Sequence, residues 1–179
     1  RGLDIMAMHG VNPRDKQASS LIGEKSFDTA TGVTKVDYTA GTEEAVLETA
    51  AAAIGEYDVT GFALSKIFGS ELAKIKVNGV PQYPEFRFGA SPSALGGTAC
   101  DVNSTVSFAN KAVGYVGDFA NGFKWGFAKD IPLEVIPYGD PDQTGKDLKA
   151  YNQVYLRAET YIGWGILDPS AFAKIIKKD

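Results

Sequence analysis

The sequence has few of the side chains on which most catalytic and metal sites depend. Its 179 residues include one cysteine, Cys100, and one histidine, His9. One cysteine excludes an internal disulfide framework, and two candidate ligands are too few for a structural zinc site. A nucleophilic side chain would need His9 as its base, yet no partner for this histidine can be identified from the sequence. We therefore expect His9 to be a structural or surface residue and Cys100 a small buried one, in a protein that is not an enzyme and binds no cofactor or metal.

Clustered positive charge is also scarce. The 22 Asp and Glu residues outnumber the 18 Lys and Arg residues, which gives a net charge of -4 and a pI near 5.1. Proteins that grip nucleic acid need clustered basic side chains, and the one notable cluster here is Lys174, Lys177 and Lys178. No apolar run is long enough to cross a bilayer. The composition therefore predicts no membrane partner, and any contact with DNA should be passive.

Apolar residues make up 44% of the chain, which is enough for one folded domain or for one domain with an appendage. The opening "RGLDIMAMHG" is typical of a helix near its C-terminal end, because Gly10 can stop it and Asn12-Pro13 turns the chain. Since the first residue is not Met, we expect an N-terminal part to be absent. Residues 13–36 are polar and lack periodicity, which predicts a long exposed loop or a weak edge ribbon.

Helix and strand signals follow in alternation. The stretch "TEEAVLETAAAAIG" predicts a helix with Thr42 as its N-cap and Gly55 as its stop. Residues 62–65, "FALS", predict a short buried strand. Ser65 should then cap a second helix that ends before an Asn78-Gly79 turn.

The second half of the chain predicts short strands separated by Gly and Asn turns, as in an antiparallel meander. These strands are residues 99–106, 112–119, 123–128 and 131–139. The last stretch, residues 150–176, is the longest strand-compatible run and breaks at Asp168-Pro169. Either a strand returns after the break, which we favour, or Asp168 is the N-cap of a terminal helix. The pattern predicts an α+β fold with a long two-stranded extension.

One fragment has the spacing of a calcium loop. In "DPDQTGKD", Asp140, Asp142 and Thr144 alternate before Gly145, as at the start of such a loop. The closing glutamate is absent, because Tyr151 stands at the twelfth position. Asp, Pro and Gly also form ordinary turns, so the two interpretations are a metal site and a turn.

A family resemblance extends over nearly the whole chain. The block "YVGDFANGFKWGFAKDIPLEV", followed by "DLKAYNQVYLRAETYIGWGILDPSAFAKI", resembles the C-terminal half of the major capsid protein of HK97-like tailed bacteriophages and prophages. The stretch "RGLDIMAMHGVNP" resembles the end of that family's long spine helix, and "YDVTGFALSKIFGSELAKIKVNGVPQY" resembles the opening of its axial domain. The family's N-terminal arm, its extended loop and most of the spine helix have no counterpart here. The features that carry the likeness are Gly117-Asp118-Phe119, the acidic strand around Glu134, Arg157-Ala158-Glu159 and residues 168–172.

The resemblance implies an HK97-like capsid fold. In that fold an axial domain has a mixed sheet with flanking helices, and the peripheral domain adds a long β-extension. Residues 1–36 would be the end of the spine helix and a connecting loop, 37–130 the axial-like domain, and 131–179 the strands of the peripheral domain.

The function that the resemblance implies is structural: self-assembly, through hexamers and pentamers, into an icosahedral shell that encloses phage DNA. The protein would belong to the virion and would be in the host cytoplasm during assembly, and a scaffold, a protease or a portal would be its further partners. The final strands of that family lie along neighbouring subunits, so Arg157 and Glu159 are candidates for ion pairs between subunits. Some members join subunits by an isopeptide bond that uses an asparagine and a glutamate, and Asn152 and Glu159 resemble these; hydrogen bonding is the alternative role.

Two alternatives remain open at this stage. An encapsulin-type nanocompartment shell has the same fold and holds protein cargo instead of DNA. A non-catalytic calcium- or carbohydrate-binding module would use the loop around Asp140 and Asp142.

Overall fold

The computed structural model describes residues 2–18, 25–108, 111–128 and 132–178. The chain divides into two compact units, one formed by Arg1–Lys124 with Gly165–Asp179 and the other by Trp125–Trp164. These boundaries differ from the predicted ones, 1–36, 37–130 and 131–179. The difference arises because residues from near both ends of the chain are adjacent strands of one sheet, a pairing that local sequence does not reveal.

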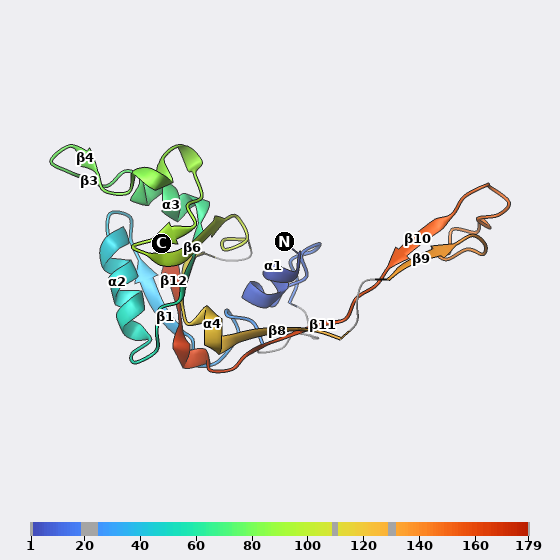
Figure 1. Cartoon of the computed structure of the whole chain (residues 1–179), viewed down its shortest axis with the longest axis horizontal. Helices are drawn as coiled ribbons and strands as arrows, with labels where there is room; N and C mark the ends of the chain where they lie inside the picture. Colours follow the sequence, from blue (N-terminus) through green and yellow to red (C-terminus); the bar gives the residue numbers. More distant parts are fainter. Residues whose placement is uncertain (1, 19–24, 109–110, 129–131, 179) are drawn as a thin grey trace. The chain divides into compact units, whose positions relative to one another are not determined.

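The first unit is built around a six-stranded mixed sheet (Figure 1). β1 runs parallel to β12 and β2 runs parallel to β6, whereas the other neighbouring pairs are antiparallel. In spatial order the strands are β1 (Thr34–Tyr38), β12 (Phe172–Lys177), β7 (Ala112–Gly117), β2 (Gly61–Ser65), β6 (Thr98–Asn103) and β5 (Ala94–Leu95).

The predicted strand positions are confirmed, but the predicted meander is wrong. Consecutive strands β6 and β7 are separated in the sheet by β2. The connection from β2 to its parallel neighbour β6 carries a helix, as crossover connections between parallel strands require. β7 is buried at all six positions, which suits an interior strand covered on both faces.

One face of the sheet is covered by α2 (Glu43–Ala53), α3 (Lys66–Leu72) and the 3-10 helix η1 (Pro84–Gly89). Ser65 caps α3 as predicted, since its Oγ accepts a hydrogen bond from the Phe68 amide at 3.2 Å. Thr42 occupies the N-cap position of α2, but its side chain makes no capping bond and donates instead to the Thr39 carbonyl. The core on this face consists of aliphatic and aromatic side chains that include Val46, Leu47, Ala50, Leu64, Phe68, Leu72, Phe86 and Ile175.

The opposite face carries α1 (Gly2–His9) and an aromatic cluster around Phe27. α1 ends at the predicted position, where Gly10 has a φ of +66°. The expectation of an exposed loop over residues 13–36 is wrong at Ser26 and Phe27, which are buried, because the Phe27 ring packs edge-on against Phe172 with ring centroids 4.9 Å apart. The end of that range forms β1, an edge strand.

The rest of the first unit consists of small elements and turns. α4 (Phe119–Gly122) is capped by Asp118, whose carboxylate accepts from the Asn121 amide at 3.1 Å. The predicted Asn78-Gly79 turn is confirmed, with positive φ at both residues, and joins β3 (Lys76–Val77) to β4 (Val80–Pro81). No helix in the described ranges is long and apolar enough to span a bilayer.

The second unit contains an antiparallel ribbon of β9 (Leu133–Ile136) and β10 (Tyr155–Ala158). A second two-stranded sheet pairs β8 (Phe123–Phe127) with β11 (Ile162–Ile166). The predicted two-stranded extension is thus present as two separate ribbons. Beyond them, the favoured returning strand is confirmed as β12, and Asp168 caps only the short 3-10 helix η2 (Pro169–Ala171).

Candidate interaction surface

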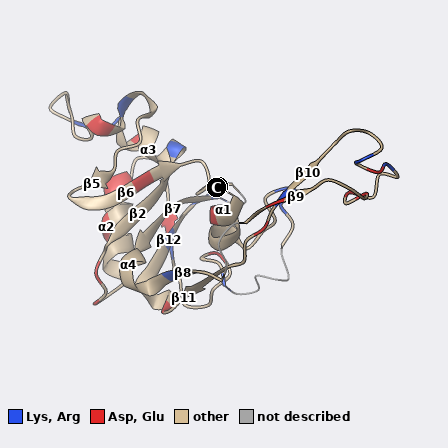
Figure 2. Ribbon diagram, turned by 45° about the vertical axis from the view of Figure 1, so that its right-hand side comes forward, with Lys and Arg blue, Asp and Glu red and all other residues tan. Residues whose placement is uncertain are grey.

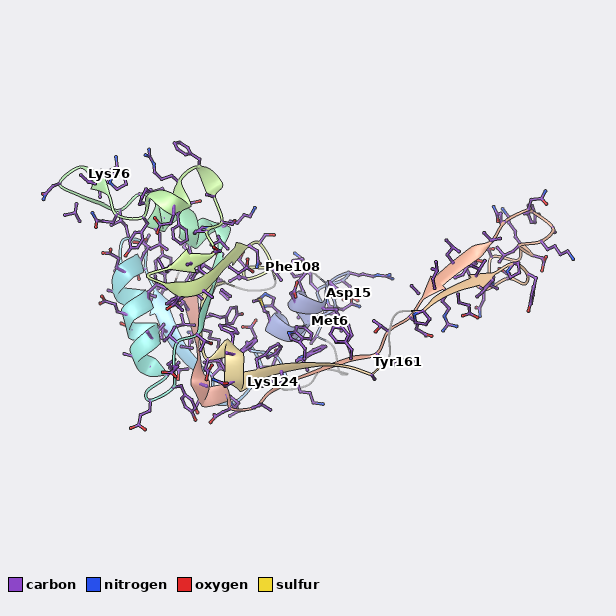
Figure 3. The ribbon with its side chains drawn as sticks, in the orientation of Figure 1. Met6, Asp15, Lys76, Phe108, Lys124 and Tyr161 are labelled. Carbon is purple, nitrogen blue, oxygen red and sulfur yellow. The ribbon has the colours of Figure 1, made fainter. Side chains whose placement is uncertain are left out.

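The β9–β10 ribbon exposes side chains on both of its faces (Figure 3). Because Val135 pairs with Leu156 in the register, these two and Leu133 share one face, and they are 56%, 59% and 67% exposed. Glu134 pairs with Arg157 on the other face. A lone two-stranded ribbon is marginally stable in water. An apolar face of this kind is typical of a surface that another protein covers.

Arg157 and Glu159, which the resemblance implied as candidates for ion pairs between subunits, form an ion pair with each other within the chain. The Arg157 guanidinium donates from Nη2 to Oε1 of Glu159 at 2.6 Å, and the two side chains are about half exposed. This hydrogen bond and the negative charges of Glu159 and Glu134 raise the pKa of Arg157 above its usual value. Arg157 therefore carries its positive charge on the face of the ribbon that also holds Glu134.

Asn152 lies in the loop between β9 and β10 and not on a strand. Its backbone N–H donates to the Lys149 carbonyl at 3.3 Å. Its φ of +52° is in the left-handed region, which asparagine tolerates better than most residues. The side chain is exposed. Asn152 and Glu159 are thus placed on either side of β10.

The loop with calcium-like spacing forms a turn centred on Asp140. One carboxylate oxygen accepts from the Thr144 amide at 2.9 Å and the other from the Gly145 amide at 2.6 Å. Desolvation opposes ionisation, but these hydrogen bonds outweigh it and lower the pKa of Asp140. Thr144 Oγ1 also lies 3.3 Å from an Asp142 oxygen. Within the described residues, no group of three or more His, Cys, Asp or Glu side chains could hold a metal ion.

His9 is a buried residue whose partners the sequence did not reveal. Its Nε2 donates to the Thr105 carbonyl at 2.7 Å, and its Nδ1 lies 2.6 Å from Oδ2 of Asp28. The Tyr115 hydroxyl donates to the other Asp28 oxygen at 2.7 Å. The Lys174 ammonium reaches the Asp28 carbonyl at 2.8 Å. These groups tie α1 to the sheet, which agrees with a structural role for the histidine.

Cys100 is buried in β6, as expected. Burial, together with the neighbouring charge of Asp101, raises the pKa of its thiol to about 11. The thiolate that a nucleophile needs is therefore disfavoured at neutral pH.

The fold of this chain matches solved structures of phages and of a GTA particle. A chain of Mycobacterium phage Ogopogo has a TM-score of 0.82 and 30% sequence identity, over 99% of this chain and 63% of its own length. A chain of Gordonia phage Cozz has a TM-score of 0.82 and 24% identity, over 99% and 59%. The capsid of an empty GTA particle has a TM-score of 0.62 and 18% identity, over 98% and 60%. No protein-family model matches the sequence, and no curated protein matches it significantly.

The chain spans about three fifths of the length of the structures it matches. These neighbours are capsid proteins of phages and of a GTA particle. The mixed sheet, its flanking helices and the strand extension are the HK97-like capsid fold. The chain has this fold, and the resemblance to phage major capsid proteins that its sequence indicated is confirmed.

Proposed function

We propose that this chain is the shell-building part of a phage major capsid protein. Copies would assemble through hexamers and pentamers into an icosahedral shell that encloses DNA in the virion. The observation that carries the proposal is the match to the Mycobacterium phage Ogopogo chain, with a TM-score of 0.82 over 99% of this chain. The neighbours are structural capsid proteins, so the proposed activity is assembly and not catalysis.

The β9–β10 ribbon is the proposed contact with neighbouring subunits. Its apolar face, formed by Leu133, Val135 and Leu156, would be covered in the shell, and its charged face would place Arg157 and Glu159 against a second subunit. Charged contacts between proteins contribute more to specificity than to affinity. A contact of this kind would orient a neighbouring subunit and still be weak enough for a wrongly placed subunit to dissociate. The domain assignment is part of this proposal: the ribbon would belong to the peripheral domain and the six-stranded sheet to the axial one.

Asn152 is proposed to make hydrogen bonds between subunits and not a covalent crosslink. A carboxamide reacts with a lysine only where a base removes the lysine proton. The Glu159 carboxylate is already engaged by the Arg157 guanidinium at 2.6 Å, which supports its role as an ion-pair partner.

Enclosed DNA would be held passively. Acidic and basic residues are interspersed over the first unit and over the β9–β10 loop (Figure 2), and the net charge is -4. A shell with little net attraction for phosphate lets DNA be packed and released. Scaffold, protease and portal partners are compatible with this proposal.

A shell with protein cargo is the second candidate. A virus-like particle from Pyrococcus furiosus has a TM-score of 0.53 and 18% identity, over 83% of this chain and 58% of its own length, so the fold does not distinguish the two kinds of particle. The phage chains match more closely and more completely.

Assembly of the complete protein, expressed alone and together with its neighbouring genes, tests the proposal. Negative-stain microscopy and light scattering should show rings or closed shells of uniform size. Nuclease-protected DNA inside the shells would support the phage assignment, and protein cargo without DNA would favour the second candidate. A protein that stays monomeric under all assembly conditions would refute the shell function.

A further inference from the structure

Phe88 combines an unusual backbone conformation with nearly complete exposure. Its φ is +60°, in the left-handed region that is an outlier for a bulky side chain, and its side chain is 96% exposed. Two residues earlier, Phe86 is 1% exposed and anchors η1 in the core. A backbone conformation of this kind is strained for a bulky residue, and such strained residues cluster at functional sites.

Arg87 and Phe88 together form an amphipathic protrusion, the Phe88–Arg87 knob. The Arg87 guanidinium carbon lies 4.9 Å from the centroid of the Phe88 ring, so the cation stacks on the aromatic face. Both residues project from the end of η1 into solvent. An exposed aromatic side chain stacked with arginine has the composition of an interface hot spot.

The same unit has a groove of matching chemistry between α2 and the β5–β6 hairpin. It has a volume of about 590 Å³, and Phe62 and Leu95 contribute apolar surface to its lining. Glu44 and Glu48 add two exposed carboxylates from α2. The Tyr83 hydroxyl donates to Oε1 of Glu44 at 2.8 Å, which links η1's N-cap residue to the helix. The groove therefore offers apolar surface and negative charge.

We propose that the Phe88–Arg87 knob of one copy docks in this groove of the next copy, with the ring on Phe62 and Leu95 and the guanidinium between Glu44 and Glu48. Because Phe88 is 96% exposed, it does not fill the groove of its own chain. Knob and groove are different surfaces of one chain, so the contact is head-to-tail, and its repetition around a hexamer or pentamer would close a ring. The inference rests on the proposed shell function and assigns one contact within its rings.

Cysteine crosslinking in assembled particles tests the contact directly. In a Cys100→Ala background, Ala90→Cys, an exposed position two residues after Phe88 that leaves the knob intact, is combined with Glu48→Cys; the particles are oxidised, and chains are separated on a non-reducing gel. A ladder of multiples is expected, since each copy is bonded to the next. The matched control replaces Glu48→Cys by Glu56→Cys, an exposed position just after α2 that does not line the groove.

The crosslinking results distinguish failure of the knob–groove contact from failure of the proposed shell function. Particles that form but give no ladder above that of the Glu56→Cys control refute the contact and leave the shell function intact. A dimer band alone would mean a reciprocal two-fold contact and would refute the head-to-tail arrangement. If the unsubstituted protein forms no particles by microscopy, the shell function fails and the contact fails with it.

Substitutions measure how much the knob contributes. Phe88→Ala should raise the protein concentration needed for assembly at least about tenfold, as removal of an interface hot spot does, while the circular dichroism spectrum of the subunit stays unchanged. Ile67→Ala, at a 59% exposed position on α3, should leave that concentration unchanged. Arg87→Glu should block assembly, and adding Glu44→Arg and Glu48→Arg should restore it. Equal effects of Phe88→Ala and Ile67→Ala would overturn the proposal.

Discussion

The Nδ1 atom of His9 lies 2.6 Å from Oδ2 of Asp28, inside the first unit. The His9 side chain is fully buried, and that of Asp28 is 12% exposed. The imidazole is hydrogen-bonded on both sides, through Nδ1 to the Asp28 carboxylate and through Nε2 to the Thr105 carbonyl. This pair fastens the helix α1 to the rest of the unit.

Loss of either partner of this pair should destabilise the fold. His9→Ala removes two hydrogen bonds, one to Asp28 and one to the buried Thr105 carbonyl, which should lower the free energy of unfolding by about 1–3 kcal/mol. Urea unfolding followed by circular dichroism measures the change. Lys35→Ala removes one partner of the exposed Lys35–Asp37 pair and should have little effect. Comparable losses for the two variants would contradict the structural role of His9.

Gly117 should not tolerate a larger side chain. A Cβ atom at this position would lie 2.4 Å from both the Ala171 carbonyl oxygen and the Phe172 ring. Gly117→Ala should therefore lower the free energy of unfolding by about 1–3 kcal/mol, since the surrounding core must shift. Gly163 is the matched control, because nothing lies within 4 Å of a Cβ atom built there. A Gly117→Ala protein as stable as Gly163→Ala would show that residues 171 and 172 can move.

The loss of folding stability at acidic pH should depend in part on Glu43. Burial opposes ionisation of this carboxyl, but hydrogen bonds from the Gly41 amide and the Tyr38 hydroxyl outweigh it and lower the pKa. As pH falls, Glu43 is protonated in the unfolded chain at a higher pH than in the folded chain. The contribution of Glu43 to the free energy of unfolding is therefore present at neutral pH and is lost as pH falls through its pKa in the folded state. Glu43→Gln should flatten this loss in unfolding experiments between neutral and acidic pH. The exposed Glu56→Gln is the control, and identical curves for the two variants would contradict the prediction.

Arg157 should affect assembly and not folding. Its ion pair with Glu159 is half exposed, so Arg157→Ala should leave the unfolding midpoint unchanged. If the charged face of the ribbon contacts a neighbour, the same variant should assemble more slowly, as measured by light scattering. Lys35→Ala provides a control with an equally exposed pair. An unchanged assembly rate would remove Arg157 from the interface.

Assembled shells should dissociate into single chains under denaturing conditions. Oε1 of Glu159 accepts from the Arg157 guanidinium at 2.6 Å, so we expect Glu159 to act as an ion-pair partner and not as the base of a crosslink near Asn152. Boiled shells of the complete protein should give one band at the monomer mass on a denaturing gel, before and after Asn152→Ala. A ladder that disappears in Asn152→Ala would mean that the covalent crosslink forms.

Local chemistry predicted much of the secondary structure. The Ser65 cap, the Asn78-Gly79 turn and the Gly10 helix stop depend on interactions within a few residues, and each is found where the sequence placed it. Thr42 shows the limit of this reasoning, because its hydroxyl found a nearby carbonyl instead of capping α2.

The sequence by itself determined the positions of the longer helices and of most longer strands, the scarcity of catalytic side chains and the resemblance to capsid proteins, because these depend on composition and short spacings. Only the tertiary structure decided the strand order, the burial of His9 and Phe27 and the exposure of Phe88. These features join residues that are distant in the chain, such as His9 with Thr105 and β1 with β12. Such contacts form only when the whole sheet assembles, since their partners are chosen by packing and not by local propensity.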